Sequence, residues 1–181
     1  GAAPRLTMPF PTTGILDSFT RADENPLANG NWTGPTFSGD GQMKLVSNQA
    51  LLVALPFGES YWSATTFGPD TEVFVTIATK DTTGAEDIFI DLRLASPGVA
   101  ASTDGYELLL DNQAGDDRWL IFRIADTTFT PLGAAMTTEY ASGDSYGFEA
   151  IGSTLTAYFK AAAGSWGAGG NRTDTSYTAA G

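Results

Sequence analysis

Cysteine and histidine are both absent from this 181-residue sequence. Without cysteine, the fold owes nothing to disulfide bonds and has no thiolate metal site. Without histidine, the chain lacks the usual zinc ligand and the usual general base near neutral pH. Together the two absences remove groups that serine, cysteine and zinc hydrolases need for catalysis.

Positive charge and long hydrophobic runs are also scarce. The chain carries 9 Lys and Arg residues against 21 Asp and Glu residues, which gives a net charge of −12. An acidic surface repels phosphate backbones and anionic membranes, so no nucleic-acid partner is expected. No apolar run approaches the ~20 residues needed to cross a bilayer, so no membrane insertion is expected. The acidic surplus favours solubility, although it could also host calcium.

The sequence contains enough apolar surface for one independent domain. The apolar fraction is 42%, the aromatic fraction is 12%, and the 21 Gly and 9 Pro residues suit a chain of many turns. The proline-rich residues 1–14 are predicted to form an extended arm or linker. Leu6, Met8 and Phe10 recur there at the period of one strand face. We therefore expect this arm, or an outside strand, to pair near a first strand at 15–19 and complete the domain.

Beyond the arm, apolar and polar residues alternate with period 2, and helical periodicity is hard to find. In residues 88–94 the apolar positions are predicted to face the core, with Asp91 and Arg93 on the opposite face. Roughly a dozen short strands are expected, at the spacing of an all-β sandwich. We therefore predict a single antiparallel two-sheet sandwich over residues 15–181. The clearest strands are at 72–77, 88–94, 106–110, 118–124, 145–151 and 154–160.

Several of these strands place polar side chains opposite their predicted core face. On a curved sheet such residues could line a concave surface that binds sugar, because carboxylates, arginines and an aromatic ring supply hydrogen bonds and a flat apolar platform. The favoured alternative is a solvated sheet face with cross-strand ion pairs, each of which contributes little. The candidate ligand-binding residues are Asp91, Arg93, Glu107, Arg123, Glu149 and Tyr158, with Lys160 beside the last.

No residue is assigned a catalytic role. Retaining glycosidases need two carboxylates about 5–5.5 Å apart. Glu86, Asp87 and Asp91 come nearest to such a group, but Glu86 and Asp91 fall on opposite strand faces. A pair from separate strands, such as Glu107 with Glu149, stays open as an inverting arrangement. The sequence therefore predicts a protein that is not an enzyme.

Two acidic loops, at 81–87 and 111–117, are the candidates for calcium. Neither has the spacing of an EF-hand loop. Asp111, Asp116 and Asp117 are the residues that such a metal could use, and turn formation is the favoured alternative for them.

The first turn of the predicted domain carries Asp17, Arg21 and Asp23. They could hold a metal or a sugar, but we predict structural roles. Short polar side chains satisfy turn amides, and an arginine can bridge two carboxylates. The nearby Trp32 and Trp62 are predicted to pack in the core or at its edge.

Several motifs follow one another in a characteristic order. A short apolar stretch leads into Asp-x-Phe-x-Arg-x-Asp at 17–23, an Asn-Trp pair stands at 31–32, and Ser-Asn-Gln at 47–49 separates two apolar runs. Later segments at 60–70 and 151–158 continue the pattern. This order resembles concanavalin A-like (laminin G-like) jelly-roll domains, above all those attached to bacteriophage tail and virion proteins. The likeness spans 15–181 and stops one strand short of the family's usual last strand.

The resemblance implies a domain that binds or displays and only sometimes catalyses. The leading expectation is a non-catalytic virion or tail module for surface display or host glycan attachment, placed at the virion surface or tail. One alternative is a carbohydrate-binding module of a secreted bacterial protein, and another is a structural decoration or cement domain. The implied partners are glycan, other virion proteins or copies of the chain itself.

Overall fold

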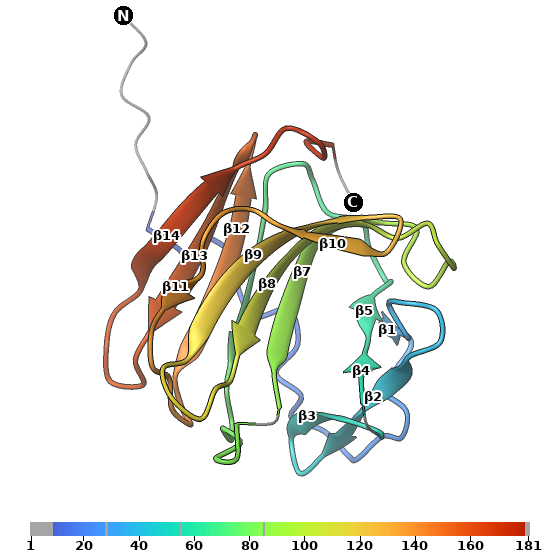
Figure 1. The fold of residues 1–181 in the computed structure, drawn as a ribbon. Coiled ribbons are helices and arrows are strands. Elements are labelled where there is room, and N and C mark those ends of the chain that lie inside the picture. The colour runs from blue at the N-terminus through green and yellow to red at the C-terminus, as the bar shows by residue number, and fades with distance from the viewer. Residues whose placement is uncertain (1–8, 28, 55, 85, 180–181) are drawn as a thin grey trace, which may run out of the picture.

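Every regular element in the computed structural model is a β-strand (Figure 1). The structure describes residues 9–27, 29–54, 56–84 and 86–179. The all-β prediction is therefore confirmed. In the described part of the chain, no helix has the length and apolar character needed to cross a membrane.

Two antiparallel sheets pack face to face and form a β-sandwich. The central sheet has the order β10-β9-β8-β7, with β11 added along β9. The second sheet has the order β14-β13-β12-β6. The strands of the central sheet are β7 (Ile88–Ala95), β8 (Asp104–Asp111), β9 (Arg118–Ala125), β10 (Thr128–Pro131) and β11 (Met136–Thr137). Those of the second sheet are β6 (Thr71–Thr76), β12 (Ser145–Ile151), β13 (Thr154–Lys160) and β14 (Gly167–Thr173).

The core lies between these two sheets and takes alternate residues from each. Trp119 on β9 and Tyr146 on β12 are fully buried and meet edge to face, with ring centroids 4.9 Å apart. Leu108 and Phe148, from the middle of β8 and β12, are also 0% exposed. Burial of each such side chain stabilises the fold by roughly 1.5–3 kcal/mol relative to exposure. The alternation read from the sequence is therefore the pattern that builds this core.

A third, smaller layer covers the outer face of the central sheet (Figure 1). We call it the N-terminal layer; it consists of two short sheets and their loops. The first has the order β3-β2-β4, and the second pairs β1 with β5. Phe37 of this layer packs on Phe129 of β10 with centroids 5.4 Å apart, and the Thr36 carbonyl accepts the Gly98 amide. The strands are β1 (Trp32–Thr33), β2 (Gly41–Val46), β3 (Gln49–Leu52), β4 (Gly58–Glu59) and β5 (Tyr61–Trp62).

Two of the hairpins turn through two residues with positive φ. Ser47 and Asn48, between β2 and β3, have φ values of 52° and 64°, and Asp126 and Thr127, between β9 and β10, have 47° and 65°. Positive φ at both central residues is the geometry of a type I′ turn, whose twist matches that of the flanking strands. These turns fix the register of the strands they join.

The predicted first strand over 15–19 is not formed. Ile15 and Leu16 are 72% and 50% exposed, and the segment has no strand partner. Asp17 instead accepts the amide of Phe19, which takes a left-handed φ of 55°. Local bonding by an aspartate side chain competes with a strand ladder, and here it prevails. The edge at which the arm was expected to pair is therefore missing.

The described end of the arm packs on the outer face of the second sheet. Phe10 is 6% exposed and stacks on Tyr158 of β13, with ring centroids 4.0 Å apart and planes at 5°. The amides of Thr12 and Thr13 both donate to Glu72 Oε1 of β6, at 2.7 and 2.6 Å. Leu6 and Met8 of the prediction lie outside the described residues. The described arm is thus a covering segment rather than a strand.

Candidate functional site

The six candidate ligand-binding residues do not form one concave site. The structure divides them among three places: Asp91 and Glu107 lie on the outer face of the central sheet, and Glu149 and Tyr158 on the outer face of the second sheet. Arg93 bonds to the turn between β12 and β13, and Arg123 bonds to the segment that follows β14. Alternation correctly placed Asp91, Glu107, Glu149 and Tyr158 opposite the core, but it could not show which strands share a sheet.

Arg93 does not lie on the face predicted for it. It has a left-handed φ of 54° at the irregularity near the end of β7, where the pairing with β8 shifts. Such a bulge re-aims a side chain. The guanidinium donates to the carbonyls of Pro69, Gly152 and Tyr177 at 2.7, 2.8 and 2.7 Å. Arg93 therefore ties three separate segments to the central sheet.

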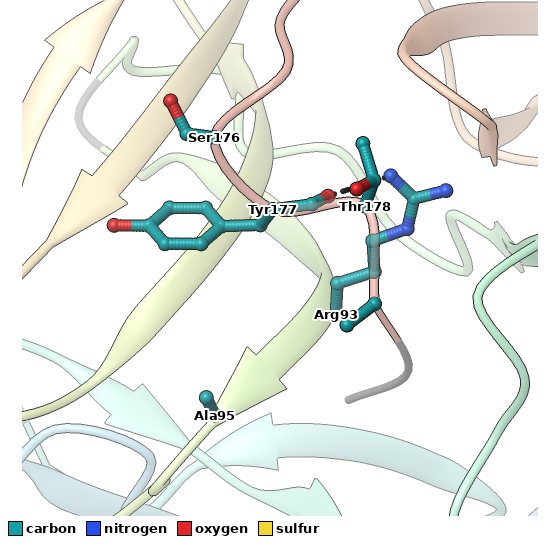
Figure 2. Close-up of a pocket in the computed structure, with 6 residues that line it drawn as sticks. Arg93, Ala95, Ser176, Tyr177 and Thr178 are labelled. Carbon is teal, nitrogen blue, oxygen red and sulfur yellow. Dashed lines mark hydrogen bonds between the residues drawn. The ribbon is translucent and has the colours of Figure 1, made fainter.

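A shallow pocket of about 200 Å³ opens beside this arginine. Figure 2 shows the Tyr177 carbonyl bonded to the guanidinium, with Ser176 and Thr178 on either side along the chain. Because the Arg93 side chain is only 1% exposed, a molecule in this pocket would meet hydroxyl and backbone groups more than charge. The residues that line it are Arg93, Ala95, Ser176, Tyr177, Thr178 and Ala179.

Arg123 holds the same C-terminal segment from β9. Its Nη1 lies 3.4 Å from Asp174 Oδ2 and 3.2 Å from Ser176 Oγ. The buried Tyr106 hydroxyl donates to Asp174 Oδ1 at 2.8 Å and accepts the Tyr177 amide at 3.0 Å. Burial, with the Asp174 carboxylate adding to it, raises the pKa of Tyr106 to about 12. Both candidate arginines are therefore engaged in holding loops.

Glu149 and Tyr158 are neighbours on the outer face of the second sheet. The Tyr158 hydroxyl donates to Glu149 Oε1 at 3.2 Å, and Phe10 covers the Tyr158 ring. Burial and then the Glu149 carboxylate raise the pKa of Tyr158 to about 12. Glu107 lies on the other side of the sandwich, since it alternates with core residues of β8. Glu107 and Glu149, which the sequence left open as an acid and base pair, therefore lie on opposite faces of the sandwich and cannot act together.

Three carboxyl groups lie near one another where the N-terminal layer covers the central sheet; we call them the carboxyl cluster. Asp91 and Glu107 are cross-strand partners on β7 and β8, and Glu59 of β4 lies near enough for its charge to act on Glu107. Glu107 is 6% exposed and Glu59 is 5% exposed. Burial, and then the charge of Glu59 and Asp87, raises the pKa of Glu107 to about 8.

The other members of the carboxyl cluster shift in the same direction. Burial, and then the nearby Asp40, raises the pKa of Glu59 to about 8. Burial and the charge of Glu107 raise the pKa of Asp91 well above its ordinary value. Sequence reasoning found Asp91 and Glu107 but missed Glu59, which belongs to a two-residue strand paired in parallel with β2. A strand this short has no periodicity that could place it.

The acidic loop at 111–117 uses its carboxylates inside the fold. Asp117 is 0% exposed, and its carboxylate accepts the Lys80 ammonium at 2.6 Å. Asp111 pairs with Arg118, while Asp116 is exposed. In the described ranges no three carboxylates gather in a way that could hold a metal ion. The geometry of this loop is that of a turn tied by ion pairs.

The first turn has the structural contacts expected of it. Asp17 accepts Arg21 Nη1 at 2.7 Å and the Trp32 indole N–H at 2.8 Å. Asp23 accepts the amide of Ser47 at 2.8 Å. The half-buried Trp32 lies edge to face on Trp62, with centroids 5.5 Å apart. Both indoles therefore pack at an edge and keep part of their surface exposed.

No family model, curated protein or solved structure matches this chain. The assignment of a function therefore rests on the residues themselves and on the geometry described above.

Proposed function

We propose that this chain is a non-catalytic module of a virion or phage tail, which displays a folded surface or attaches to host glycan. The finer fold in this proposal is the concanavalin A-like jelly roll. Two antiparallel sheets packed face to face, together with the order of motifs in the sequence, support that fold.

One observation carries the non-catalytic part of the proposal. The pair of neighbouring carboxyls that most resembles a glycosidase pair, Asp91 with Glu107, lies under the N-terminal layer. Glu59 of that layer is 5% exposed at the same place. A sugar chain would need to displace this layer before it could reach either carboxyl. Covered carboxyls support a scaffold role over hydrolysis.

A carbohydrate-binding module of a secreted protein is the second candidate, and the aromatic rim favours it. The rim consists of Phe19, Trp32 and Trp62. Phe19 and Trp32 stack with centroids 5.7 Å apart. All three rings are half-buried, and the neighbouring Asn29, Thr33 and Ser63 are exposed. Partly exposed rings beside hydrogen-bonding groups suit a sugar face. Glycan would bind to this rim in a virion module and in a secreted carbohydrate-binding module alike.

A glycan array followed by calorimetry tests the proposal. We expect the parent to bind at least one glycan and Trp62→Ala to lose most of that affinity. Phe57→Ala removes an aromatic ring that is 53% exposed outside the rim, and it is the matched control that should bind normally. Unchanged binding by Trp62→Ala would remove the rim from the proposal. Absence of glycan binding would leave display or cementing as the role.

Hydrolysis is tested on the same glycans by release of reducing ends. We expect no turnover by the parent. Turnover that disappears in Glu107→Gln would refute the non-catalytic proposal and identify Glu107 as the acid.

A further inference from the structure

The carboxyl cluster joins two layers of the molecule. Asp91 and Glu107 are directly opposite each other on antiparallel strands, where Cβ atoms lie about 4.5–5.5 Å apart. Glu59 belongs to the N-terminal layer, and its Oε2 accepts the Phe37 amide of the same layer at 3.0 Å. The cluster is therefore built from both sides of the interface between the layer and the central sheet.

Within the described residues, no basic group forms an ion pair with these carboxyls. The charged groups that act on Glu59 and Glu107 are all carboxylates: Asp40 before β2, Asp87 before β7, and the members of the cluster. The partner of Glu107 on β9 is Phe122, and that of Glu59 on β2 is Gln42. Buried like charges at this spacing cannot all ionise. Something positive must therefore accompany them.

The burial of these carboxyls and an unpartnered oxygen among them point to protons. Glu59 and Glu107 are only 5% and 6% exposed, so each carboxyl is held away from water. Asp91 Oδ1 is buried and has no hydrogen-bond partner in the described structure. Carboxylate oxygens do not converge in threes on a metal position anywhere in the described ranges. A proton, unlike a metal ion, needs only one or two oxygens.

We propose that Glu59, Asp91 and Glu107 hold protons at neutral pH and that these protons latch the N-terminal layer onto the central sheet. Loss of the protons leaves like charges on both sides of the interface, so the layer is repelled from β7 and β8. Opening would expose the side of the central sheet that carries Phe122 and Phe129. This device goes beyond the proposed function because it needs no ligand.

The pH window follows from linkage. The pKa of both Glu59 and Glu107 rises from 4.5 to about 8 in the folded state. The latched state therefore binds protons more tightly than the opened or unfolded state. Its stability is complete below about pH 4.5 and falls as pH rises toward 8, where the folded groups ionise too. The cluster titrates as a unit, so the measured midpoints belong to the group.

Urea unfolding from about pH 5 to about pH 9 tests the latch. We expect the unfolding constant of the parent to rise about tenfold per pH unit for each proton released. Glu107→Gln and Glu59→Gln mimic the protonated carboxyl, so each should flatten this dependence. The matched control is Glu86→Gln, at an exposed position, and it should keep the slope of the parent. The two variants lie on opposite sides of the interface, so the test still gives a result if one of them fails to fold.

Infrared spectroscopy of the parent needs no variant. A protonated carboxyl absorbs at a different infrared frequency from a carboxylate. The parent should therefore show the band of the protonated carboxyl at neutral pH and lose it toward about pH 9. A spectrum without the band at neutral pH overturns the proposal. A parent whose stability is flat over the same range also overturns it. If millimolar calcium abolishes the pH dependence, the positive partner is a metal ion and the proton latch is wrong.

Discussion

The packing of Phe10 on the outer face of the second sheet predicts a large effect of its removal on stability. Phe10 is 6% exposed, stacks on Tyr158 and meets the Trp166 ring edge to face at 4.9 Å. Removing a buried Phe side chain costs about 3–5 kcal/mol in a core, and aromatic pairs add about 0.5–1.5 kcal/mol. The arm lies at the surface and can relax, so we expect Phe10→Ala to cost about 3 kcal/mol.

A substitution at Gly147 of β12 disturbs the packing of Phe10 in an independent way. A Cβ added at Gly147 would lie 2.2 Å from Phe10 Cζ and 2.3 Å from its Cε1. Gly147→Ala must therefore expel the ring, and we expect it to cost about 2–3 kcal/mol in the parent. In the Phe10→Ala background the space is open, so the same substitution should cost less than about 1 kcal/mol. The two changes should thus be non-additive by about 2 kcal/mol.

Urea denaturation of the four proteins in this cycle gives the coupling energy. A thermal scan should show Phe10→Ala melting roughly 6–12 °C below the parent. Phe67→Ala is the control, because that ring is 43% exposed and should cost under about 1 kcal/mol. Additive effects at Phe10 and Gly147, or a Phe10→Ala variant that melts with the parent, would show that the arm does not hold this face.

Three further predictions concern polar contacts. Asp17→Ala removes the acceptor of the Trp32 indole N–H and should lower the free energy of unfolding by about 1–3 kcal/mol in urea denaturation; a variant as stable as the parent would contradict a structural role. Burial would raise the pKa of Asp117, but Lys80 and two backbone amides outweigh it and hold that pKa below its ordinary value of 3.8. The stability that Asp117 contributes is therefore present above about pH 4 and is lost as pH falls. Asp117→Asn should make the free energy of unfolding depend less on pH in the acid range. An unchanged dependence in that range would contradict this. A lysine at position 93 lacks the planar guanidinium that bonds three carbonyls at once, so Arg93→Lys should lower the free energy of unfolding by about 2–4 kcal/mol in thermal unfolding. A variant as stable as the parent would show that these three bonds are not needed for stability.

The long strands could be predicted from the sequence because each buries one face. The hairpin of β12 and β13 and the run from β7 to β9 occupy the segments in which apolar and polar residues alternate. Burial of alternate side chains is a local signal with a period of two residues. The fold class and most of the core followed from it.

The candidate site could not be predicted in the same way. Arg93 follows the alternation in sequence, yet a left-handed residue at a bulge re-aims it. Glu59 joins Asp91 and Glu107 only through the packing of the N-terminal layer, and its strand has two residues. Contacts between layers depend on tertiary structure, about which periodicity carries no information. The same limit explains why Phe10 packs on a sheet face rather than along a strand edge.

The path of the first sixty residues has a consequence for synthesis on the ribosome. Phe10 is made long before its partners Tyr158 and Trp166. Glu59 is likewise made before Glu107, the residue near which it lies. Contacts this distant in sequence slow folding, because a long loop must close before they form. The N-terminal segment therefore emerges before the two large sheets on which it packs, and its contacts with them form late. It must stay unaggregated until the last strands arrive, and a high negative charge with no cysteine to cross-link suits that delay.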